Sequence, residues 1–356
     1  MQRLARALVA GAVVASAIAL GAQPAMADDS QIVPPGGSIQ AAVDAALPGG
    51  SIQLLPGTYA GGVTVTKPGI TIRGAGPETV IAPAGANACA ATGMFPPTGI
   101  CVFGAPGHPV HGVTVESLTV RDFTVGVFGI LTDRLTVRTV YAVDNEDYGV
   151  AEFESTRGEF VGDWISGSGG EAGLYVGDSA DAHGTRVEGN HVTGSAVGTF
   201  VRHSHHVIVK GNFLEGDCTG IVLLDDGQAG GQGDNEVSAN IVRDNNVYCP
   251  PNGEGAPPLQ GTGIALVGGQ HNQVSANIVD DNRGGPGPIP GGIVLIPGLT
   301  ATGGFGGAPA AHNTISANVA HGNVPADIVD HSGSASNVFA ANVCDTSQPG
   351  GLCVHA

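Results

Sequence analysis

Two short phrases alternate along the second half of the chain and set its pattern of apolar and polar positions. The first phrase places an asparagine three positions after a branched aliphatic residue, and the second follows a glycine with alternating aliphatic residues. The first occurs as Val187-Glu-Gly-Asn190, Val209-Lys-Gly-Asn212, Val237-Ser-Ala-Asn240, Val274-Ser-Ala-Asn277 and Ile315-Ser-Ala-Asn318. The second occurs as Gly173-Leu-Tyr-Val, Gly220-Ile-Val-Leu, Gly263-Ile-Ala-Leu and Gly292-Ile-Val-Leu. Such short alternating runs predict strands, and no helical period accompanies them.

The shortest spacing between copies, from Asn190 to Asn212, is 22 residues. This period is typical of one turn of a parallel β-helix, so the sequence predicts an all-β, right-handed solenoid of roughly ten three-strand rungs. Each rung then buries its inward residues only against its neighbours. We interpret the recurring asparagines as a structural column whose amides satisfy the backbone of a buried turn. The column contains Asn190, Asn212, Asn240, Asn277 and Asn318.

The opening of the chain carries Ser38-Ile-Gln-Ala-Ala-Val-Asp-Ala-Ala, Pro48-Gly-Gly-Ser-Ile-Gln-Leu-Leu-Pro-Gly-Thr-Tyr59 and Ile70-Thr-Ile-Arg-Gly-Ala-Gly76. Together with the repeat, this opening resembles the parallel β-helix repeat family with the pectin-lyase-like fold. The resemblance implies a capping segment over 28–62, with a short amphipathic helix that begins at Ser38, and a solenoid over 63–356. It also implies that the glycine phrase forms a first sheet. Insertions at 249–262 and 283–291 before that sheet, and at 227–235 and 297–311 after it, would flank one groove.

Residues 1–27 read as a signal peptide, because Arg3 and Arg6 precede an apolar run that ends in Ala25-Met26-Ala27. Removing them leaves 11 basic against 31 acidic residues, a formal charge of −20. Such a chain should avoid nucleic acid and anionic membranes. No later apolar run is long enough for a membrane span. We therefore expect a secreted, extracellular monomer.

All six cysteines lie after the signal peptide, as expected of an oxidising compartment. Six cysteines allow 15 pairings, but in a solenoid only those on the same or adjacent rungs can meet. We therefore predict three disulfides, with a thiolate zinc site as the alternative. The pairs are Cys89–Cys101, Cys218–Cys249 and Cys344–Cys353.

Aligning the glycines of the second phrase places ionisable residues in one column on four consecutive rungs. The column contains Glu154, Asp178, His203 and Asp225, and Arg202 precedes its histidine. Stacked carboxylates repel one another unless they are solvated, shift their pKa values or recruit a cation. We interpret Glu154, Asp178, Asp225, Arg202 and His203 as candidate catalytic residues; a row of solvated turns is the alternative. The outward Tyr175 and Phe200 would form a sugar platform.

The resemblance implies a carbohydrate-active protein whose partner is a polysaccharide or another glycan. A polysaccharide lyase would use Ca²⁺ on Glu154, Asp178 and Asp225 to neutralise a uronate, and Arg202 or His203 would take the proton. A glycosidase would instead need two of these carboxylates as acid and base or nucleophile. A non-catalytic glycan-binding or accessory protein is the third hypothesis. The chain lacks the pectate-lyase Trp-Ile-Asp-His run and most polygalacturonase motifs, so no catalytic assignment is carried over from either.

Overall fold

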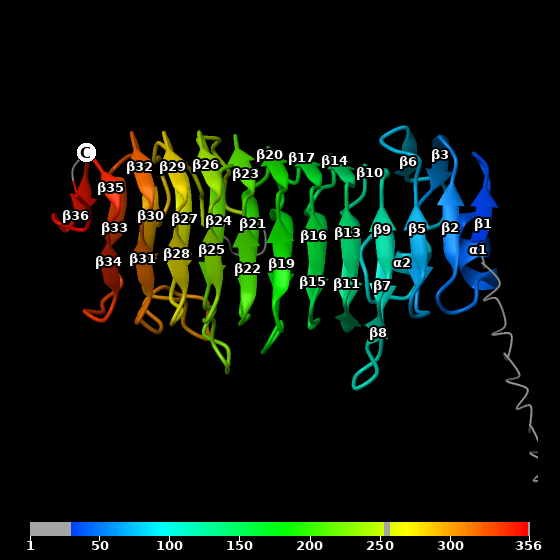
Figure 1. The fold of residues 1–356 in the computed structure, drawn as a ribbon, viewed down its shortest axis with the longest axis horizontal. Helices are drawn as coiled ribbons and strands as arrows, with labels where there is room; N and C mark the ends of the chain where they lie inside the picture. Colours follow the sequence, from blue (N-terminus) through cyan, green and yellow to red (C-terminus); the bar gives the residue numbers. More distant parts are fainter. Residues whose placement is uncertain (1–29, 253–256, 355–356) are drawn as a thin grey trace, which may run out of the picture.

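The computed structural model describes residues 30–252 and 257–354, and it shows a right-handed parallel β-helix (Figure 1). Three long parallel sheets run the length of the molecule, and the chain passes from the first sheet to the second, then to the third, in every rung. The all-β solenoid predicted from the repeat is confirmed. We call the turn from the first to the second sheet the first corner, the turn from the second to the third sheet the second corner, and the return to the first sheet the third corner.

The strands of each sheet follow one another in chain order. The first sheet contains β4 (Val63–Val65), β7 (Thr98–Phe103), β11 (Val125–Ile130), β15 (Tyr148–Phe153), β18 (Ala172–Gly177), β21 (Val197–Arg202), β24 (Thr219–Leu224), β27 (Thr262–Val267), β30 (Gly291–Ile296), β33 (Ile328–Asp330) and β36 (Ser347–Gln348). The second contains β1 (Ser30–Val33), β2 (Ser51–Leu54), β5 (Thr71–Arg73), β9 (Thr114–Glu116), β13 (Thr136–Arg138), β16 (Glu159–Val161), β19 (Thr185–Glu188), β22 (Val207–Lys210), β25 (Glu236–Ser238), β28 (Gln273–Ser275), β31 (Thr314–Ser316) and β34 (Val338–Ala340). The third contains β3 (Gly57–Ala60), β6 (Thr79–Ala82), β10 (Thr119–Arg121), β14 (Tyr141–Val143), β17 (Trp164–Ser166), β20 (His191–Thr193), β23 (Phe213–Glu215), β26 (Ile241–Arg243), β29 (Ile278–Asp280), β32 (Val319–His321) and β35 (Val343–Cys344). A small pair, β8 (Val110–His111) and β12 (Thr132–Asp133), lies at the first corner.

The interior is filled by aliphatic side chains that stack in register from rung to rung. Ile221 pairs with Ile264 and then Ile293, for example, and all three are fully buried. A second apolar cluster covers the outer face of the first sheet. The first sheet is therefore buried on both faces along much of its length, which explains its near-continuous aliphatic sequence.

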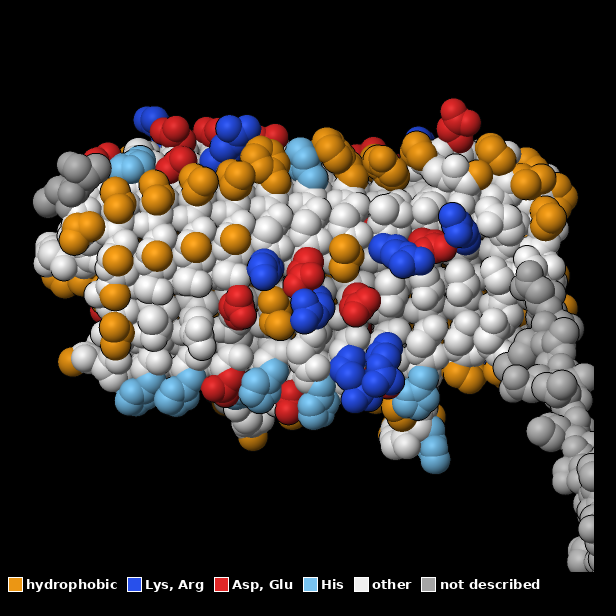
Figure 2. Space-filling model, viewed as in Figure 1, with side chains coloured by type: hydrophobic (Ala, Val, Ile, Leu, Met, Phe, Trp, Pro, Cys, Tyr) orange, Lys and Arg blue, Asp and Glu red, His pale blue; other side chains and the backbone are white. Residues whose placement is uncertain are grey.

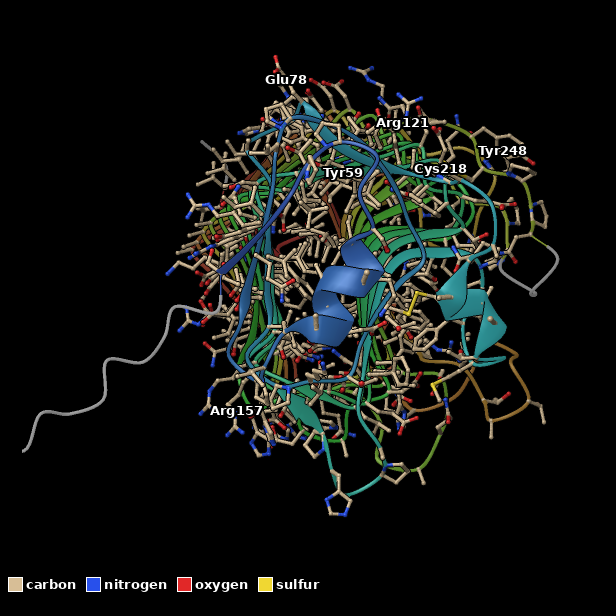
Figure 3. The ribbon with its side chains drawn as sticks, turned by 90° about the vertical axis from the view of Figure 1, so that its right-hand side faces the viewer. Tyr59, Glu78, Arg121, Arg157, Cys218 and Tyr248 are labelled. Carbon is tan, nitrogen blue, oxygen red and sulfur yellow. A yellow bond between two sulfur atoms is a disulfide. The ribbon has the colours of Figure 1, made fainter. Side chains whose placement is uncertain are left out.

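The N-terminal end of the solenoid is covered by helix α1 (Ile39–Ala45), which lies across the opening in Figure 3. Ser38 is its N-cap, and its hydroxyl accepts a hydrogen bond from the Ala41 N–H at 3.1 Å. Ile39, Ala42 and Val43 face the core. The capping helix is confirmed, whereas the predicted signal peptide lies outside the described residues. Within the described part of the chain, no helix is long and apolar enough to span a membrane.

Asparagine ladders line the corners. At the second corner, Oδ1 of Asn277 accepts the N–H of Asn240 and its side-chain amide, and Nδ2 of Asn277 donates to the Val237 carbonyl and to Asn318. The column predicted from Asn190 to Asn318 occupies this position. Two more ladders, absent from the prediction, lie at the first and third corners. They contain Asn235, Asn272 and Asn313, and Asn245, Asn282 and Asn323.

Aspartates take ladder positions at two places. The Asp163 carboxylate accepts the Val140 N–H, and the Asp217 carboxylate accepts the Ser195 N–H. Burial raises the pKa of both carboxyl groups well above the usual value. Each of these carboxyl groups takes the acceptor role of an asparagine amide, whereas its second oxygen has no hydrogen-bond partner among the described residues.

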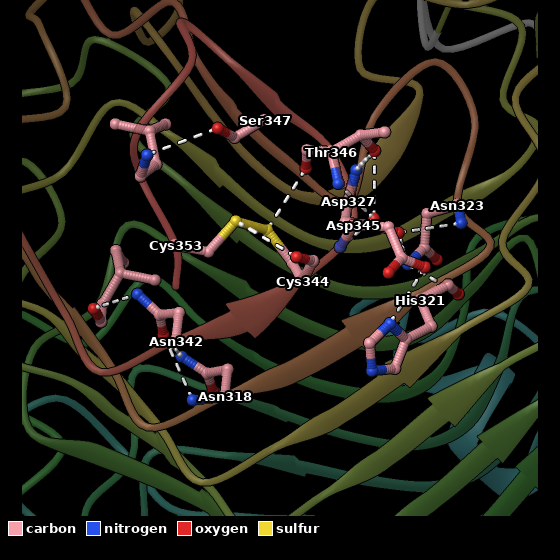
Figure 4. The surroundings of a disulfide bond; sticks show 12 residues. Asn318, His321, Asn323, Asp327, Asn342, Cys344, Asp345, Thr346, Ser347 and Cys353 are labelled. Carbon is pink, nitrogen blue, oxygen red and sulfur yellow. Dashed lines mark hydrogen bonds and ion pairs between the residues drawn. A yellow bond between two sulfur atoms is a disulfide. The ribbon is translucent and has the colours of Figure 1, made fainter. Parts of the chain in front are cut away.

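Three disulfides join Cys89 to Cys101, Cys218 to Cys249, and Cys344 to Cys353, the same pairs that the sequence predicts. The first ties helix α2 (Ala88–Ala91) to β7, and the second ties the start of β24 to the loop before β27. The third closes the C-terminal rung beside the end of the asparagine ladder (Figure 4).

Candidate functional site

A groove of about 840 Å³ lies on the outer face of the first sheet over β21, β24 and β27. The segments before and after the sheet form its two walls, as the resemblance implied, with Pro250 and Ile289 on one side and Leu299 and Phe305 on the other. Phe200, Val222 and Leu224 form much of its floor. The groove is therefore mostly apolar, and its few charged side chains are the candidate catalytic or ligand-binding groups.

The predicted column of ionisable residues lies where the first-sheet strands end. The N–H of Glu154 donates to the Gly177 carbonyl, that of Asp178 to the Arg202 carbonyl, and that of His203 to the Leu224 carbonyl. Glu154, Asp178 and His203 share a left-handed backbone, with φ values of 46°, 55° and 47°. The first three positions therefore stack with the spacing of one rung, roughly 4.8 Å.

Arg202 and His203 both contact the carboxylate of Asp226, a residue outside the predicted column. Nε of Arg202 donates to Oδ2 of Asp226 at 3.0 Å, and Nδ1 of His203 lies 3.2 Å from Oδ1 of the same residue. Gln228 donates to Asp226 through both its backbone N–H and its side-chain amide. Burial disfavours the charge of Asp226, but these hydrogen bonds and the charges of Arg202 and His203 outweigh it and lower its pKa. The buried Asp226 carboxylate thus accepts a hydrogen bond from the Arg202 guanidinium, and the His203 imidazole lies beside it without a hydrogen bond from Nδ1.

Asp225, which the alignment chose, has a different role. Its carboxylate accepts the Gly227 N–H at 2.9 Å and closes the turn. The inserted segment after β24 changes the path of the chain here, and Asp225 lacks the left-handed backbone of the earlier members of the column. The structure therefore places Asp226, and not Asp225, beside Arg202 and His203. Glu154 is exposed to solvent one rung further from the cluster, directly after β15.

Tyr175 and Phe200 point outward from the first sheet, but they do not form an exposed platform. The Tyr175 ring is fully buried, stacked on Phe153 at 4.4 Å between centroids and packed edge-on against Phe200 at 5.5 Å. Phe200 is only 9% exposed, in the floor of the groove. Because these aromatic side chains all lie on the outer face of the first sheet, they pack against one another and shield one another from solvent. The predicted platform is thus corrected to an aromatic support beneath the site.

The hydroxyl end of Tyr175 reaches over Gly177, where a Cβ atom would lie 2.1 Å from the Tyr175 oxygen. Gly177 pairs with Arg202 in the sheet. Burial raises the pKa of Tyr175, and the nearby Arg202 charge opposes that rise. Tyr175 is therefore a neutral phenol beneath the guanidinium, in a position that only glycine at 177 permits.

Asp178 lies near the Arg202, His203 and Asp226 side chains and is half-buried. Burial raises its pKa, the Asp226 charge adds to the rise, and Arg202 and His203 oppose it. Asp178 and Asp226 thus have pKa values shifted in opposite directions by their surroundings. Two carboxyl groups whose pKa values are shifted apart can serve as an acid and a base at the same pH.

The proposed calcium ligands do not form one site. Among residues 30–252 and 257–354, no group of three or more His, Cys, Asp or Glu side chains is arranged to hold a metal ion. Glu154 is exposed, and Asp225 uses its carboxylate within its own turn. Glu154, Asp178 and Asp225 therefore do not fit a shared calcium ion, and no step below involves one.

A profile of the family described as right handed beta helix region matches residues 170–355. The chain belongs to this family. Among solved structures, the A-module of the Azotobacter vinelandii mannuronan C-5 epimerase AlgE6 aligns over 91% of this chain and 96% of its own, with a TM-score of 0.66 and 16% identity. A variant of the periplasmic alginate epimerase AlgG aligns over 89% and 77%, with a TM-score of 0.58 and 13% identity.

The catalytic unit of a GH87 α-1,3-glucanase from Streptomyces thermodiastaticus is also similar to this β-helix chain. It aligns over 92% of this chain and 64% of its own, with a TM-score of 0.56 and 16% identity. At these identities the likeness extends to the fold alone. A search of curated protein sequences found no significant match.

Proposed function

We propose that this β-helix protein is a secreted carbohydrate-active enzyme that removes a proton from the carbon beside the carboxylate of a uronate in a polysaccharide. The observation that carries the proposal is the contact of Arg202 with Asp226 in the groove over the first sheet, with the His203 imidazole 3.2 Å from the same carboxylate. Elimination and epimerisation of uronates both begin with this proton transfer. The names of the AlgE6 and AlgG neighbours, both epimerases, support this class of reaction.

Arg202 would bind the uronate carboxylate. Its side chain is 37% exposed and lines the groove, while its Nε is fixed by Asp226. Removing the adjacent carbon-bound proton places negative charge on the carboxylate, and a fixed guanidinium stabilises that charge in the transition state. Arg202 also suits the planar carboxylate geometrically, because its remaining N–H groups form a rigid fork.

His203 would take the proton. An imidazole titrates close to neutral pH, so it is a suitable base under ordinary conditions. The Asp226 carboxylate, 3.2 Å from Nδ1, stabilises the imidazolium that forms. Asp178, whose pKa is raised, would act as the acid on the neighbouring rung. Protonation of the same carbon from the opposite face gives the epimer, and loss of the adjacent glycosidic oxygen gives an unsaturated product.

A second candidate is glycoside hydrolysis, favoured by the opposed pKa shifts of Asp178 and Asp226. Asp178 would then protonate the leaving oxygen, and Asp226 would act as base or nucleophile. The glucanase neighbour is compatible with this chemistry on the same fold. The two candidates differ in product, because hydrolysis yields reducing ends without unsaturation.

The products of a panel of polyuronates and neutral glucans separate these candidates. The mature protein is incubated with each polymer, in calcium and in chelator, and unsaturated products are followed by ultraviolet absorbance and reducing ends by a colorimetric assay. We expect turnover of a polyuronate that falls by at least about 100-fold in Arg202→Ala and in His203→Ala. Arg283→Ala, on the exposed third corner, is the matched control and should retain activity.

If the protein produces reducing ends without unsaturated products, and Asp178→Asn abolishes them, the reaction is hydrolysis and not proton abstraction. Turnover that persists in both Arg202→Ala and His203→Ala would refute the assigned site. Binding of a polymer without any product, including an epimer detected by nuclear magnetic resonance, would favour the non-catalytic hypothesis.

A further inference from the structure

The outer face of the third sheet carries a row of exposed apolar side chains far from the groove of the first sheet. Each three-residue strand of the third sheet buries its middle residue and turns its first and third residues outward. The first positions pair in register from strand to strand, so their side chains form one row, which Figure 2 shows along the upper edge of the molecule. The row contains Tyr141, Trp164, His191, Phe213, Ile241, Ile278 and Val319.

The row changes from rings to aliphatic side chains at β26. Isoleucine and valine suit any half-exposed strand, whereas the four rungs from β14 to β23 carry Tyr141, Trp164, His191 and Phe213, which we call the ring row. Trp164, the single tryptophan of the chain, is 43% exposed, and Tyr141 is 36% exposed. The His191 ring lies 3.9 Å from the Trp164 ring and 5.0 Å from the Phe213 ring, measured between centroids. The ring row thus extends over roughly 14 Å along the solenoid axis.

Polar groups lie beside the ring row, at the third position of the same strands. Ser166 pairs with Thr193 across the sheet, and Thr193 pairs with Glu215. The Glu215 carboxylate accepts hydrogen bonds from Arg243 at 3.0 and 3.2 Å, and the Arg243 guanidinium lies 4.9 Å from the centroid of the Phe213 ring. The formal charges of Glu215 and Arg243 cancel. The face beside the rings therefore offers hydroxyl groups and a neutral ion pair.

The second corner, on the other side of the rings, is bare. Its left-handed residue two positions before the ring is glycine on three consecutive rungs, at Gly162, Gly189 and Gly211. On the next three rungs, which carry the aliphatic side chains, the same position holds Ala239, Ala276 and Ala317. A Cβ atom at any of the three glycines would meet no atom within 4 Å, so packing does not exclude a larger residue. Glycine leaves the edges of the rings uncovered on this side.

Exposed rings with hydroxyl groups beside them match the two faces of a sugar. The C–H groups of a pyranose ring pack against the negative face of an aromatic ring, and the sugar hydroxyls need hydrogen-bond partners at the edge of that ring. Charge decides which sugar polymer fits. The chain carries a formal charge of −18, and the ion pair beside the rings is neutral, so an acidic polymer is repelled by the protein and gains no attraction here. An uncharged polymer meets no such repulsion.

We propose that the ring row binds an uncharged, extended β-linked glycan laid along the solenoid axis. A flat ribbon of pyranose rings places its C–H faces on Trp164 and the neighbouring rings, and its hydroxyl groups beside Ser166 and Thr193. The bare second corner leaves room for the width of the ribbon. The groove near Arg202 lies on a different sheet, so binding by the ring row is independent of the reaction proposed for the groove.

The fluorescence of Trp164 reports occupancy of the ring row directly, because the chain has a single tryptophan. The mature protein is titrated with cellotetraose, and the emission wavelength and the quenching by acrylamide are recorded. We expect a saturable blue shift and reduced quenching, since a stacked sugar removes water from the exposed indole. Polygalacturonate should leave both quantities unchanged, and Arg202→Ala should respond to cellotetraose as the wild type does.

Calorimetric titration with cellotetraose tests the rest of the ring row. Phe213→Ala should weaken binding by about fivefold or more, because it removes one aromatic face from the row. Ile278→Ala, at the same position of β29, removes an exposed apolar side chain from the aliphatic part of the row and is the matched control. It should bind as the wild type does. Thermal unfolding of each variant establishes that it is folded.

Unchanged Trp164 emission and quenching throughout the titration would overturn the proposal, and so would wild-type affinity in folded Phe213→Ala. An equal fluorescence response to polygalacturonate would overturn the assignment to an uncharged glycan. A dimer in sedimentation analysis that Trp164→Ala dissociates would also overturn it, because the ring row would then be a contact between two copies of the chain.

Discussion

The first and second corners both carry an inward asparagine ladder and left-handed residues, but they differ in length and in their outward side chains. At the second corner, asparagine amides point inward and bond the backbone of the next rung, while the left-handed position carries only Ala, Gly, Ser or Thr. At the first corner, an inward ladder is also present, but the left-handed position two residues before the second-sheet strand carries mostly large side chains. These residues are Arg134, Arg157, Gly184, His206, Asp234, His271 and His312. The comparison shows that the inward asparagines stabilise the turns, whereas the outward side chains can vary without changing the backbone.

Among the substitutions that test this difference between the corners, we expect the largest loss of stability from a ladder asparagine at the second corner. Asn277→Ala removes the acceptor for the Asn240 N–H and amide and the donor to the Val237 carbonyl, all of them buried. Each unsatisfied buried group costs about 1–3 kcal/mol, so we expect a loss of roughly 3–5 kcal/mol in the free energy of unfolding. Denaturant titration measures it. Gln273→Ala, on the exposed face of β28, should change the same quantity by less than about 0.5 kcal/mol.

A smaller, pH-dependent effect is expected inside the first corner at Glu152. This side chain is fully buried, and burial raises its pKa to about 8, opposed by a hydrogen bond from Thr185. Above its ordinary pKa of 4.5 the folded state retains a proton that the unfolded chain has lost. Its contribution to stability is therefore greatest at low pH and declines towards pH 8, by at most about 1.4 kcal/mol per pH unit.

Glu152→Gln should remove that decline. The free energy of unfolding of the variant, relative to the wild type, should increase as the pH rises from about 5 to about 8. Glu154→Gln, two positions later and exposed, serves as the control and should give no such slope. A flat difference for Glu152→Gln would show that this carboxyl is not protonated in the folded protein.

The smallest effect is expected at the outward face of the second corner. Ala276 has a φ of 54°, which costs a residue with a Cβ atom roughly 1–2 kcal/mol. Glycine removes that cost but loses more backbone entropy on folding, by about 0.5–1 kcal/mol. Ala276→Gly should therefore stabilise the fold by no more than about 1 kcal/mol in thermal unfolding. A large destabilisation would mean that the outward methyl group is needed for packing.

The repeat allowed the solenoid and its inward positions to be predicted, because each rung buries its side chains at the same phase of the sequence. The capping helix followed from the family resemblance of the opening at Ser38. The missed ladders had the same signal: Asn235, Asn272 and Asn313 each lie five positions before an asparagine of the predicted column. Their spacing equals that of Asn240, Asn277 and Asn318, so the same signal could have found them. The alignment of the glycines identified Asp178 and His203 correctly as neighbours in space.

Other features depend on tertiary packing that spacing does not contain. The choice of Asp226 over Asp225 depends on the path of the inserted turn after β24. The burial of Tyr175 depends on the rings of Phe153 and Phe200 on neighbouring rungs.

The most direct test of the account is the exchange of hydrogen at the carbon beside the uronate carboxylate. The mature protein is incubated with polyuronates in deuterium oxide, and deuterium at that carbon is measured by nuclear magnetic resonance. We predict that the wild type incorporates deuterium or generates the unsaturated product, and that folded His203→Ala does neither. A wild type that does neither on any polyuronate, while binding the polymer, would contradict proton abstraction at the Arg202–His203–Asp226 cluster.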